Sequence, residues 1–425
     1  MKRLQVLIYS LIGLLFLTQI SCEKENNVYP RVVIKYPLSG GNYDFRDTLR
    51  MGVEVVNDDG RVSVSLMDGA RVISVAHQLV YQQGSLHEYE LYFTDKNLKS
   101  GKYEIQVLAF NGENRGSDFS EIRYVELPLR LKGFMTLSGN GNIATVTSYD
   151  SIGNIKDIQL NGDYPYLAFN SYQQVGVAAP EVNGQLTAFS FISPAAVFSV
   201  TNPANEGLRQ YEYLFSDDEL NYALENNGRI RAYNSDGLVA KSFSLPNGYI
   251  PQKGKIAEPG FLVAAQLDGT NSFQLFLLNP QNGSVQKQTN LPGKVVSIGY
   301  AGQSTFVLTY RKNGDAIIGT YNTVSNLLTE YGKISGAKPL SLLRISDNEF
   351  LISTENKILR FNPHSPQIPS LLYSFAAADM EYDELANQAY FASGKNVWIA
   401  NNWQAPYTVL TTNDSIRQIE LVYNK

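Results

Sequence analysis

The side chains that could carry out chemistry are few and lie far apart in this chain. Its 425 residues include three histidines, His77, His87 and His364, and one cysteine, Cys22. Metal centres and nucleophilic triads need several such groups at a defined spacing. Neither the histidines nor any Ser/His/Asp grouping provides that spacing, so we predict no metal site, no catalytic residue and no cofactor.

Acidic residues form clusters at four places: NDDG at 57–60, SDDE at 216–219, SDN at 346–348 and EYDE at 381–384. None of them has the alternate-residue spacing of a calcium-binding loop. Because Asp and Asn favour turns, we expect solvated hairpin turns at all four places. The alternative is that carboxylates from distant segments converge and act as a pair in glycoside cleavage.

The single cysteine directly follows an apolar segment at the start of the chain. Lys2 and Arg3 precede residues 4–20, which carry no charge, and Ser21 stands before Cys22. This layout is typical of a secretory signal and is short for a membrane span. An unpaired cysteine at this place would be accounted for by covalent modification of its thiol.

The segment resembles the bacterial lipoprotein signal, in which a small residue precedes a cysteine. In that family the cysteine is acylated and, after cleavage of the signal, becomes the first residue of the mature protein. Gln19 stands where that family prefers Leu. The resemblance implies a signal peptide over 1–21, lipid on Cys22, and an outer-membrane location on the surface or periplasmic side. The polar residues 22–29 are then a tether, in which Glu23 and Glu25 resemble the surface-export signal of Bacteroidetes-type lipoproteins. The alternative is an ordinary cleaved signal or a single anchor helix.

Charge and composition exclude some partners and favour one fold class. Removing residues 1–21 would leave 33 basic and 40 acidic residues, a net charge of −7. An acidic protein is a poor ligand for nucleic acid or for anionic lipid head groups. Apolar and polar residues alternate with a period of two between turns rich in Gly, Asn, Asp and Pro, which predicts an all-β protein.

Residues 30–128 are predicted to form one β-sandwich. Turns such as SGGN, NDDG and KSGK separate seven short alternating runs, each predicted to be one strand. The runs are RVVIKYP, TLRMGVEVVN, RVSVSLMD, RVISVAHQLV, HEYELYFTD, GKYEIQVLAFN and EIRYVEL. This spacing suits an immunoglobulin-like sandwich. The pieces YPLSGGNYDFRDTL and GKYEIQVLAFN also resemble the Ig-like modules of bacterial surface proteins.

Residues 130–425 contain an internal repeat. An asparagine in a tight polar turn between two alternating runs recurs at positions 140, 183, 227, 271, 313, 356 and 396, at intervals of 40 to 44 residues. A fixed period of this length with about four strands per period predicts a β-propeller, and seven turns imply seven blades. The recurring Asn has a structural role in type I′ hairpins, which require positive φ.

The two ends of the repeat predict how the propeller closes. Only one strand, LKGFMTLS, fits before Asn140, whereas SIRQIELVYNK at the C-terminus is one strand too many. We expect this final strand to complete the first blade as its innermost strand. A ring closed in this way has no free edge.

One face of the propeller is the predicted binding surface, because turns between second and third strands share that face with the links between blades. Gln185, Gln252 and Lys253 would also lie on this face, and Trp403 and Tyr407 would lie on the opposite face. The predicted ligand-binding residues are Asn183, Asn227, Tyr249, Lys312, Asn313, Asn356, Lys357, Lys395 and Asn396. Amide, ammonium and aromatic groups suit a sugar chain. A hydrated loop face without a ligand is the alternative.

The whole layout resembles the Ig-plus-propeller surface lipoproteins of Bacteroidetes-type bacteria, which implies glycan capture. The expected function is a lipid-anchored binding or scaffold protein of the outer membrane whose propeller face binds a glycan or a protein partner. The alternative is a polysaccharide hydrolase or lyase whose carboxylates converge at the propeller channel. A fold by itself does not decide between them.

Overall fold

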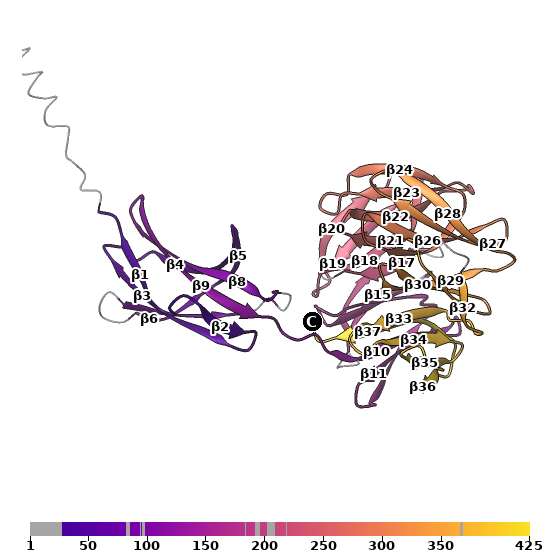
Figure 1. The fold of residues 1–425 in the computed structure, drawn as a ribbon, viewed down its shortest axis with the longest axis horizontal. Helices are drawn as coiled ribbons and strands as arrows, with labels where there is room; N and C mark the ends of the chain where they lie inside the picture. The colour runs from indigo at the N-terminus through magenta and orange to yellow at the C-terminus, as the bar shows by residue number, and fades with distance from the viewer. Residues whose placement is uncertain are drawn as a thin grey trace, which may run out of the picture. The chain divides into compact units, whose positions relative to one another are not determined.

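The computed structural model describes residues 28–81, 86–93, 95, 98–182, 184–191, 196–201, 209–217, 219–365 and 369–425. The predicted signal peptide, Cys22 and the tether up to residue 27 lie outside these ranges. The chain divides into two compact units, Met1–Pro128 and Leu129–Lys425 (Figure 1). Every regular element within the described ranges is a β-strand, and none of those ranges holds a helix long and apolar enough to cross a membrane.

The first unit consists of two sheets that enclose a core. Residues of β8 alternate between the two sides: Tyr103, Ile105 and Val107 are buried, whereas Glu104 is exposed. The strand orders are β1 (Arg31–Tyr36), β3 (Thr48–Val56), β7 (Leu86–Tyr92) and β6 (His77–Tyr81) in one sheet, and β2 (Gly41–Asp44), β9 (Asn114–Val125), β8 (Gly101–Asn111), β4 (Val62–Asp68) and β5 (Arg71–Val75) in the other.

The strands of this unit differ in part from the seven predicted. RVISVAHQLV was expected to be a single strand, but it divides at Ala76 into β5 and β6, which belong to different sheets. The Ala76 N–H donates to the Val64 carbonyl of β4 2.8 Å away, at the point where the chain leaves β5. In addition, β2 occupies part of a segment predicted to be a turn and pairs in parallel with β9. Pairing partners decide such breaks, and a single sequence does not display them.

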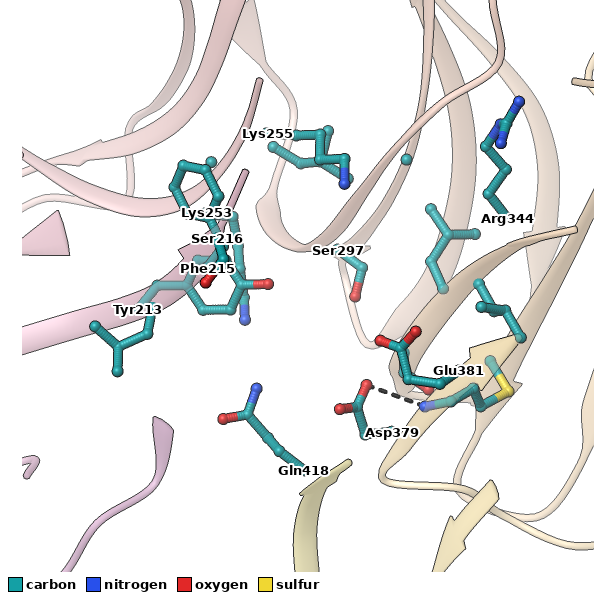
Figure 2. Close-up of a pocket in the computed structure, with 18 of the residues that line it drawn as sticks. Tyr213, Phe215, Ser216, Lys253, Lys255, Ser297, Arg344, Asp379, Glu381 and Gln418 are labelled. Atoms are coloured by element: carbon teal, nitrogen blue, oxygen red, sulfur yellow. Dashed lines mark hydrogen bonds between the residues drawn. The ribbon is translucent and has the colours of Figure 1, made fainter. Parts of the chain in front are cut away.

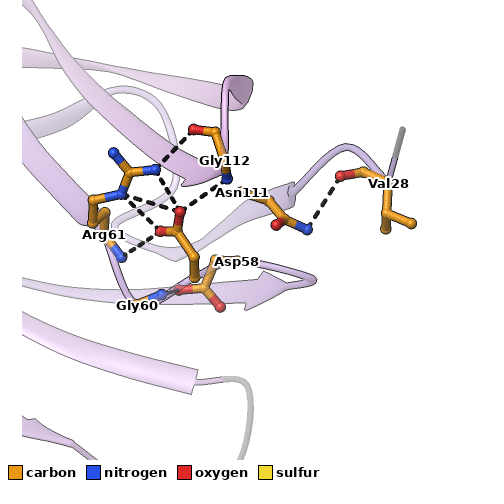
Figure 3. A network of polar contacts seen from close by, with 7 residues as sticks. Val28, Asp58, Gly60, Arg61, Asn111 and Gly112 are labelled. Atoms are coloured by element: carbon orange, nitrogen blue, oxygen red, sulfur yellow. Dashed lines mark hydrogen bonds and ion pairs between the residues drawn. The ribbon is translucent and has the colours of Figure 1, made fainter. Parts of the chain in front are cut away.

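The NDDG cluster links β3 to β4, and its charged side chains bind neighbouring groups of the same unit (Figure 3). The Arg61 guanidinium binds the Asp59 carboxylate and donates to the Gly112 carbonyl at 2.8 Å. The Gly112 N–H donates to the same carboxylate at 3.0 Å. These contacts tie the β3–β4 turn to the β8–β9 hairpin, so the cluster has a structural role.

The second unit is an all-β propeller. Within its described residues it holds seven four-stranded antiparallel sheets. From one edge to the other, the first sheet contains β37 (Ile416–Tyr423), β10 (Leu131–Gly139), β11 (Ile143–Asp150) and β12 (Ile155–Asn161), and the second contains β13 (Tyr166–Asn170), β14 (Val175–Ala179), β15 (Gln185–Ser190) and β16 (Ala196–Thr201). In the same order, the third contains β17 (Tyr211–Ser216), β18 (Asn221–Glu225), β19 (Arg229–Tyr233) and β20 (Val239–Ser244), the fourth contains β21 (Tyr249–Ala257), β22 (Gly260–Leu267), β23 (Phe273–Leu278) and β24 (Val285–Leu291), and the fifth contains β25 (Lys294–Tyr300), β26 (Thr305–Lys312), β27 (Asp315–Asn322) and β28 (Leu327–Ile334). The sixth contains β29 (Pro339–Ser346), β30 (Glu349–Thr354), β31 (Ile358–Phe361) and β32 (Ser370–Tyr373), and the seventh contains β33 (Asp379–Asp383), β34 (Gln388–Ser393), β35 (Asn396–Asn401) and β36 (Tyr407–Thr411).

The recurring asparagines lie at equivalent places in these sheets. Six of the seven stand in or beside the hairpin that joins the second strand to the third, and Asn183 lies outside the described residues. Asn313 has a φ of 53° and is followed by Gly314 at 86°, which is the left-handed conformation that this residue pair adopts at low cost. Among the six described asparagines the predicted positive φ is found at Asn313 alone, whereas Asn140 and Asn227 accept backbone N–H groups within their turns.

The first strand of each sheet, counted from the edge given first above, contacts the same strand of the next sheet. The contacts run from β37 to β13, β17, β21, β25, β29 and β33, and β33 contacts β37 again. We call these seven the inner strands. The predicted pairing of the C-terminal segment is confirmed, because β37 pairs antiparallel with β10 over Leu131–Ser138.

Candidate functional site

A cavity of about 550 Å³ is lined by residues from all seven inner strands (Figure 2). We call it the channel. Its lining includes serines, an amide and charged groups of both signs, together with aromatic rings from β17. The volume lies within the range typical of small-ligand sites. The channel therefore has the size and polarity to hold a small hydrophilic molecule.

Two lysines of β21 enter the channel. The Lys253 ammonium lies 3.7 Å from the centroid of the Tyr213 ring, a cation–π contact. Burial lowers the pKa of Lys253 to about 8. Gly254 between the lysines allows close packing, because a Cβ there would lie 2.9 Å from Phe261. Alternation along the strand then puts Lys253 and Lys255 on one side.

Three carboxylates line the channel from β33 and β37. Asp379 and Glu381 are two residues apart on β33, so they face the same side, and Glu420 comes from β37. Asp379 is held in place by the Ile419 N–H at 3.1 Å and the Met380 N–H at 3.0 Å. All three side chains keep partial solvent exposure because they border the cavity.

These carboxylates lie deep among protein atoms, and this changes their protonation. Burial raises the pKa of Asp379 to about 6. Burial, with the charge of Asp379 second, raises the pKa of Glu381 to about 8. Burial and the charges of Glu381 and Asp379 raise the pKa of Glu420 well above its usual value. At neutral pH, protonated and ionised carboxyl groups therefore lie together on one wall.

The prediction that all four acidic clusters are solvated turns is wrong for EYDE. Glu381 and Asp383 belong to β33, Glu381 lines the channel, and buried Asp383 accepts a hydrogen bond from the Tyr423 hydroxyl at 3.1 Å. Turn propensity here gives way to pairing with β34. Asp217 of SDDE does cap a turn, since it accepts from the Leu220 N–H at 2.7 Å.

The predicted ligand residues are spread over several sheets, and none of those that the structure describes lines the channel. Lys312 and Asn313 line a separate groove of about 370 Å³ beside β28, which we call the side groove, and Lys312 pairs with Glu330 at 2.9 Å. Tyr249 packs against Phe276 with ring centroids 5.0 Å apart. Of the residues predicted near this face, Lys253 is the one that lines the channel.

The remaining predicted residues mostly support their own turns. Asn227 accepts from the Arg229 N–H at 3.0 Å, and Asn396 accepts from the Thr411 hydroxyl at 2.7 Å. The Lys395 ammonium donates to the Asn413 carbonyl at 2.5 Å. Asn356 is exposed and Lys357 is half-buried in the β30–β31 turn, whereas Asn183 lies outside the described residues.

Trp403, predicted on the face opposite the ligand residues, packs against its own propeller. Its ring stacks on Tyr382 with centroids 5.6 Å apart, and the Arg360 guanidinium lies 5.3 Å from its centroid. His364 lies with its ring nitrogen 3.4 Å from the Ala301 carbonyl oxygen. In the part of the chain that the structure describes, no three His, Cys, Asp or Glu side chains are grouped to hold a metal ion.

Sequence reasoning missed four of the channel residues, Lys255, Asp379, Glu381 and Glu420. A signal for them exists in the sequence. The inner strands carry the patterns KGK at 253–255, DME at 379–381 and QIE at 418–420. Each has charged or polar residues two apart in a strand, at the same place in the repeat. Such residues face one side together, and comparing the seven repeats would have drawn attention to them.

Comparison with known proteins supports the fold. No family model matches the chain, and no curated protein matches it in sequence. The similar solved structures include a Lactobacillus plantarum protein, at 10% identity over 69% of this chain and 100% of that one with a TM-score of 0.52. They also include Kuenenia stuttgartiensis hydrazine synthase, at 10% identity over 64% and 96% with a TM-score of 0.51. A candidate 6-phosphogluconolactonase from Bacteroides fragilis is similar at 12% identity over 68% and 98% with a TM-score of 0.50. The structural neighbours are β-propellers, so the second unit has a propeller fold. At these identities the similarity concerns the fold alone.

Proposed function

We propose that this protein is a lipid-anchored binding protein of the bacterial outer membrane and that its propeller binds a glycan in the channel. One observation carries the proposal: all seven inner strands contribute to a single cavity of about 550 Å³ with polar and charged walls. Sugars are bound through hydrogen bonds to such groups and through contacts with aromatic rings, and Tyr213 and Phe215 supply rings in this lining.

The proposed architecture is an Ig-like sandwich followed by a seven-bladed propeller, with blades corresponding to the seven sheets. The closed order of contacts among the inner strands supports one ring. The two-sheet arrangement of β1–β9 supports a sandwich of the immunoglobulin type. In this proposal the first unit lies between the lipid anchor and the ligand-binding propeller in the order of the chain.

The proposed anchor is lipid on Cys22, after cleavage of residues 1–21. The uncharged run 4–20 and the small residue Ser21 before the only cysteine support it. Labelled palmitate fed to cells that produce the protein should be incorporated into the full chain and not into a Cys22→Ala variant. Equal labelling of both chains would contradict the anchor and would leave the channel proposal standing.

Binding of a glycan can be tested with the full chain in detergent on an array of bacterial and host oligosaccharides. We expect a specific signal that falls at least tenfold in Lys253→Met, because the variant keeps the bulk of the side chain and loses its ammonium. Lys312→Met, in the side groove, is the matched control and should bind as the unchanged chain does. An array without any signal, or equal losses in both variants, would contradict a glycan site in the channel.

A second function is favoured by the protonation of the channel carboxylates. A protonated Glu381 beside an ionised carboxylate is the combination that glycoside cleavage by general acid–base catalysis uses. On this alternative, the channel is the active site of a polysaccharide hydrolase or lyase. Release of reducing ends from a polysaccharide panel, abolished by Glu381→Gln, would favour the enzyme over the binding protein. A partner protein that stays bound through purification would instead favour the scaffold role.

A further inference from the structure

The lysines and the carboxylates of the channel come from opposite sides of the closed circuit of inner strands. From β37 the contacts pass through β13 and β17 to β21, and from β21 they pass through β25 and β29 to β33. In a circuit of seven, β21 is therefore as far as a strand can be from both β33 and β37. Lys253 and Lys255 of β21 form a cationic wall, and Asp379 and Glu381 form an acidic wall (Figure 2). Glu420 of β37 belongs to the acidic wall as well.

The opposite charges do not neutralise each other directly. Among the described residues, no ion pair within 4.0 Å joins either of these lysines to any of these three carboxylates. They interact across the channel: Asp379 attracts the Lys253 ammonium, and Lys255 attracts Glu381. A charged network that served only to hold the fold would be paired, because unpaired buried charges are costly. Lys253 on one wall and the ionised Asp379 on the other therefore have capacity for charges on a ligand, whereas the raised pKa values of Glu381 and Glu420 favour their protonated, hydrogen-bonding forms.

Both walls are held in place before any ligand arrives. The Lys253 ammonium lies over the Tyr213 ring, and Asp379 accepts two backbone N–H groups. The one further cation of the lining, Arg344, is already paired with Asp347 at 2.6 Å. Rigid, charged side chains reduce the entropy lost when a ligand binds.

Neutral polar groups complete the lining and suit hydroxyl groups. Ser297 and Ser341 contribute hydroxyls, and Gln418 contributes an amide. The Gln418 side-chain oxygen accepts from the Leu167 N–H, which fixes the amide and leaves its NH₂ group to donate. A hydroxyl-rich ligand can form hydrogen bonds with all three of these groups.

We propose that the channel selects zwitterionic oligosaccharides, which carry a free amino group for the acidic wall and a carboxylate for the cationic wall. The inference rests on the proposed glycan-binding function and names its ligand class. An amino sugar joined to a uronic acid is the smallest such ligand. Both charges contribute to selection, because a ligand that carries only one of them leaves the opposite wall without a partner charge.

The test uses one disaccharide in four forms and the full chain in detergent. Glucosaminyl-glucuronic acid is the zwitterion, its N-acetyl form is anionic, its methyl ester is cationic, and the form with both changes is neutral. Calorimetry at about pH 7 should show the zwitterion binding at least tenfold more tightly than each singly charged form, and the neutral form binding most weakly.

Two variants separate the walls. Lys253→Met should remove the preference for the carboxylate over its methyl ester and leave the preference for the free amine. Asp379→Asn, which removes the carboxylate of the acidic wall that is ionised at about pH 7, should do the reverse. Lys312→Met in the side groove is the control and should keep both preferences. Melting curves of all three establish that the variants fold, and a variant that does not fold is replaced by Lys255→Met on the cationic wall or by Asp379→Ser on the acidic wall.

The outcomes separate this inference from the proposed function. Equal affinity for all four disaccharides, or tightest binding of a singly charged form, would overturn the selection of zwitterions and leave glycan binding intact. Binding of none of them together with an empty glycan array would overturn both. Triglycine, a zwitterion without hydroxyls, should bind at least tenfold more weakly than the disaccharide, and equal binding would overturn the assignment to a sugar.

Discussion

At the scale of single residues, the channel combines groups that a stable fold would avoid. Asp379, Glu381 and Glu420 repel one another, and burial opposes the charge of each. Side chains that are held in such an arrangement at a cost in stability are often functional. The half-buried Lys253, whose pKa is lowered to about 8, belongs to the same group.

This cost can be measured at Glu381 through the pH dependence of stability. Its pKa in the folded protein, about 8, lies above the usual 4.5, so the folded state holds the proton more tightly than the unfolded state does. The resulting stability is fully present below pH 4.5 and is lost as the pH rises through 8. Glu381→Gln, which cannot ionise, should therefore be more stable than the unchanged chain at about pH 9, by roughly 1–3 kcal/mol after allowance for solvent in the channel.

The measurement is the free energy of urea unfolding of both chains between pH 5 and 9. The two curves should run close together at the acidic end and separate as the pH approaches the pKa of about 8. Glu330→Gln is the matched control, because a salt bridge to Lys312 lowers the pKa of Glu330, and this variant should show no gain at high pH. If the stability curves of Glu381→Gln and the unchanged chain stay parallel over this pH range, the Glu381 carboxyl group titrates as it does in water.

At the scale of elements, closure of the propeller depends on β37. This strand pairs with β10, and its buried side chains include Ile416, Ile419 and Val422. It also supplies Glu420 to the channel and holds Asp379 through the Ile419 N–H. One strand thus completes the first sheet, joins it to the last one and positions two site residues.

A chain that ends at Asn413 lacks β37 and should not fold cooperatively. Burial of Ile416, Ile419, Leu421 and Val422 is worth roughly 6–12 kcal/mol, which is comparable with the 5–15 kcal/mol total stability of a typical domain. Calorimetry should show that the main transition is lost, whereas a chain that lacks only Lys425 should melt within a few degrees of the full chain. A cooperative transition in the Asn413 chain at the original temperature would refute closure by β37.

At the scale of the whole molecule, the two units have separate cores. One hydrophobic cluster is built from Val32 to Tyr124, and the other clusters are built entirely from residues after Pro128. Units with independent cores generally fold independently. The propeller should therefore need no part of the first unit for its stability.

A chain of residues 129–425 should unfold in one transition at the temperature of the corresponding transition of the full chain, within about 3 °C. The full chain should show a second transition that residues 28–128 alone reproduce. Differential scanning calorimetry of the three chains tests this. A shift of 10 °C or more in the propeller transition would contradict independent folding.

The sequence by itself determined those features that arise from neighbouring residues. Alternating residues and Asn-Gly turns were sufficient to predict the all-β class and the repeat, because strands and hairpins are local. The position of the last strand was predictable too, since a repeat that begins one strand short requires a strand from the other end. The pattern around Cys22 supports the lipid anchor in the same local way, and that anchor remains a prediction.

Only the tertiary structure decided which side chains meet in the channel. Lys253, Glu381 and Glu420 are far apart in the chain, and the closed order of inner strands brings them around one cavity. No local pattern measures that closure, so EYDE was taken for a turn and the predicted ligand residues were placed on the hairpins. The division of RVISVAHQLV between two sheets has the same cause. Pairing and burial between distant segments outweigh local propensity, and they exist only in the folded chain.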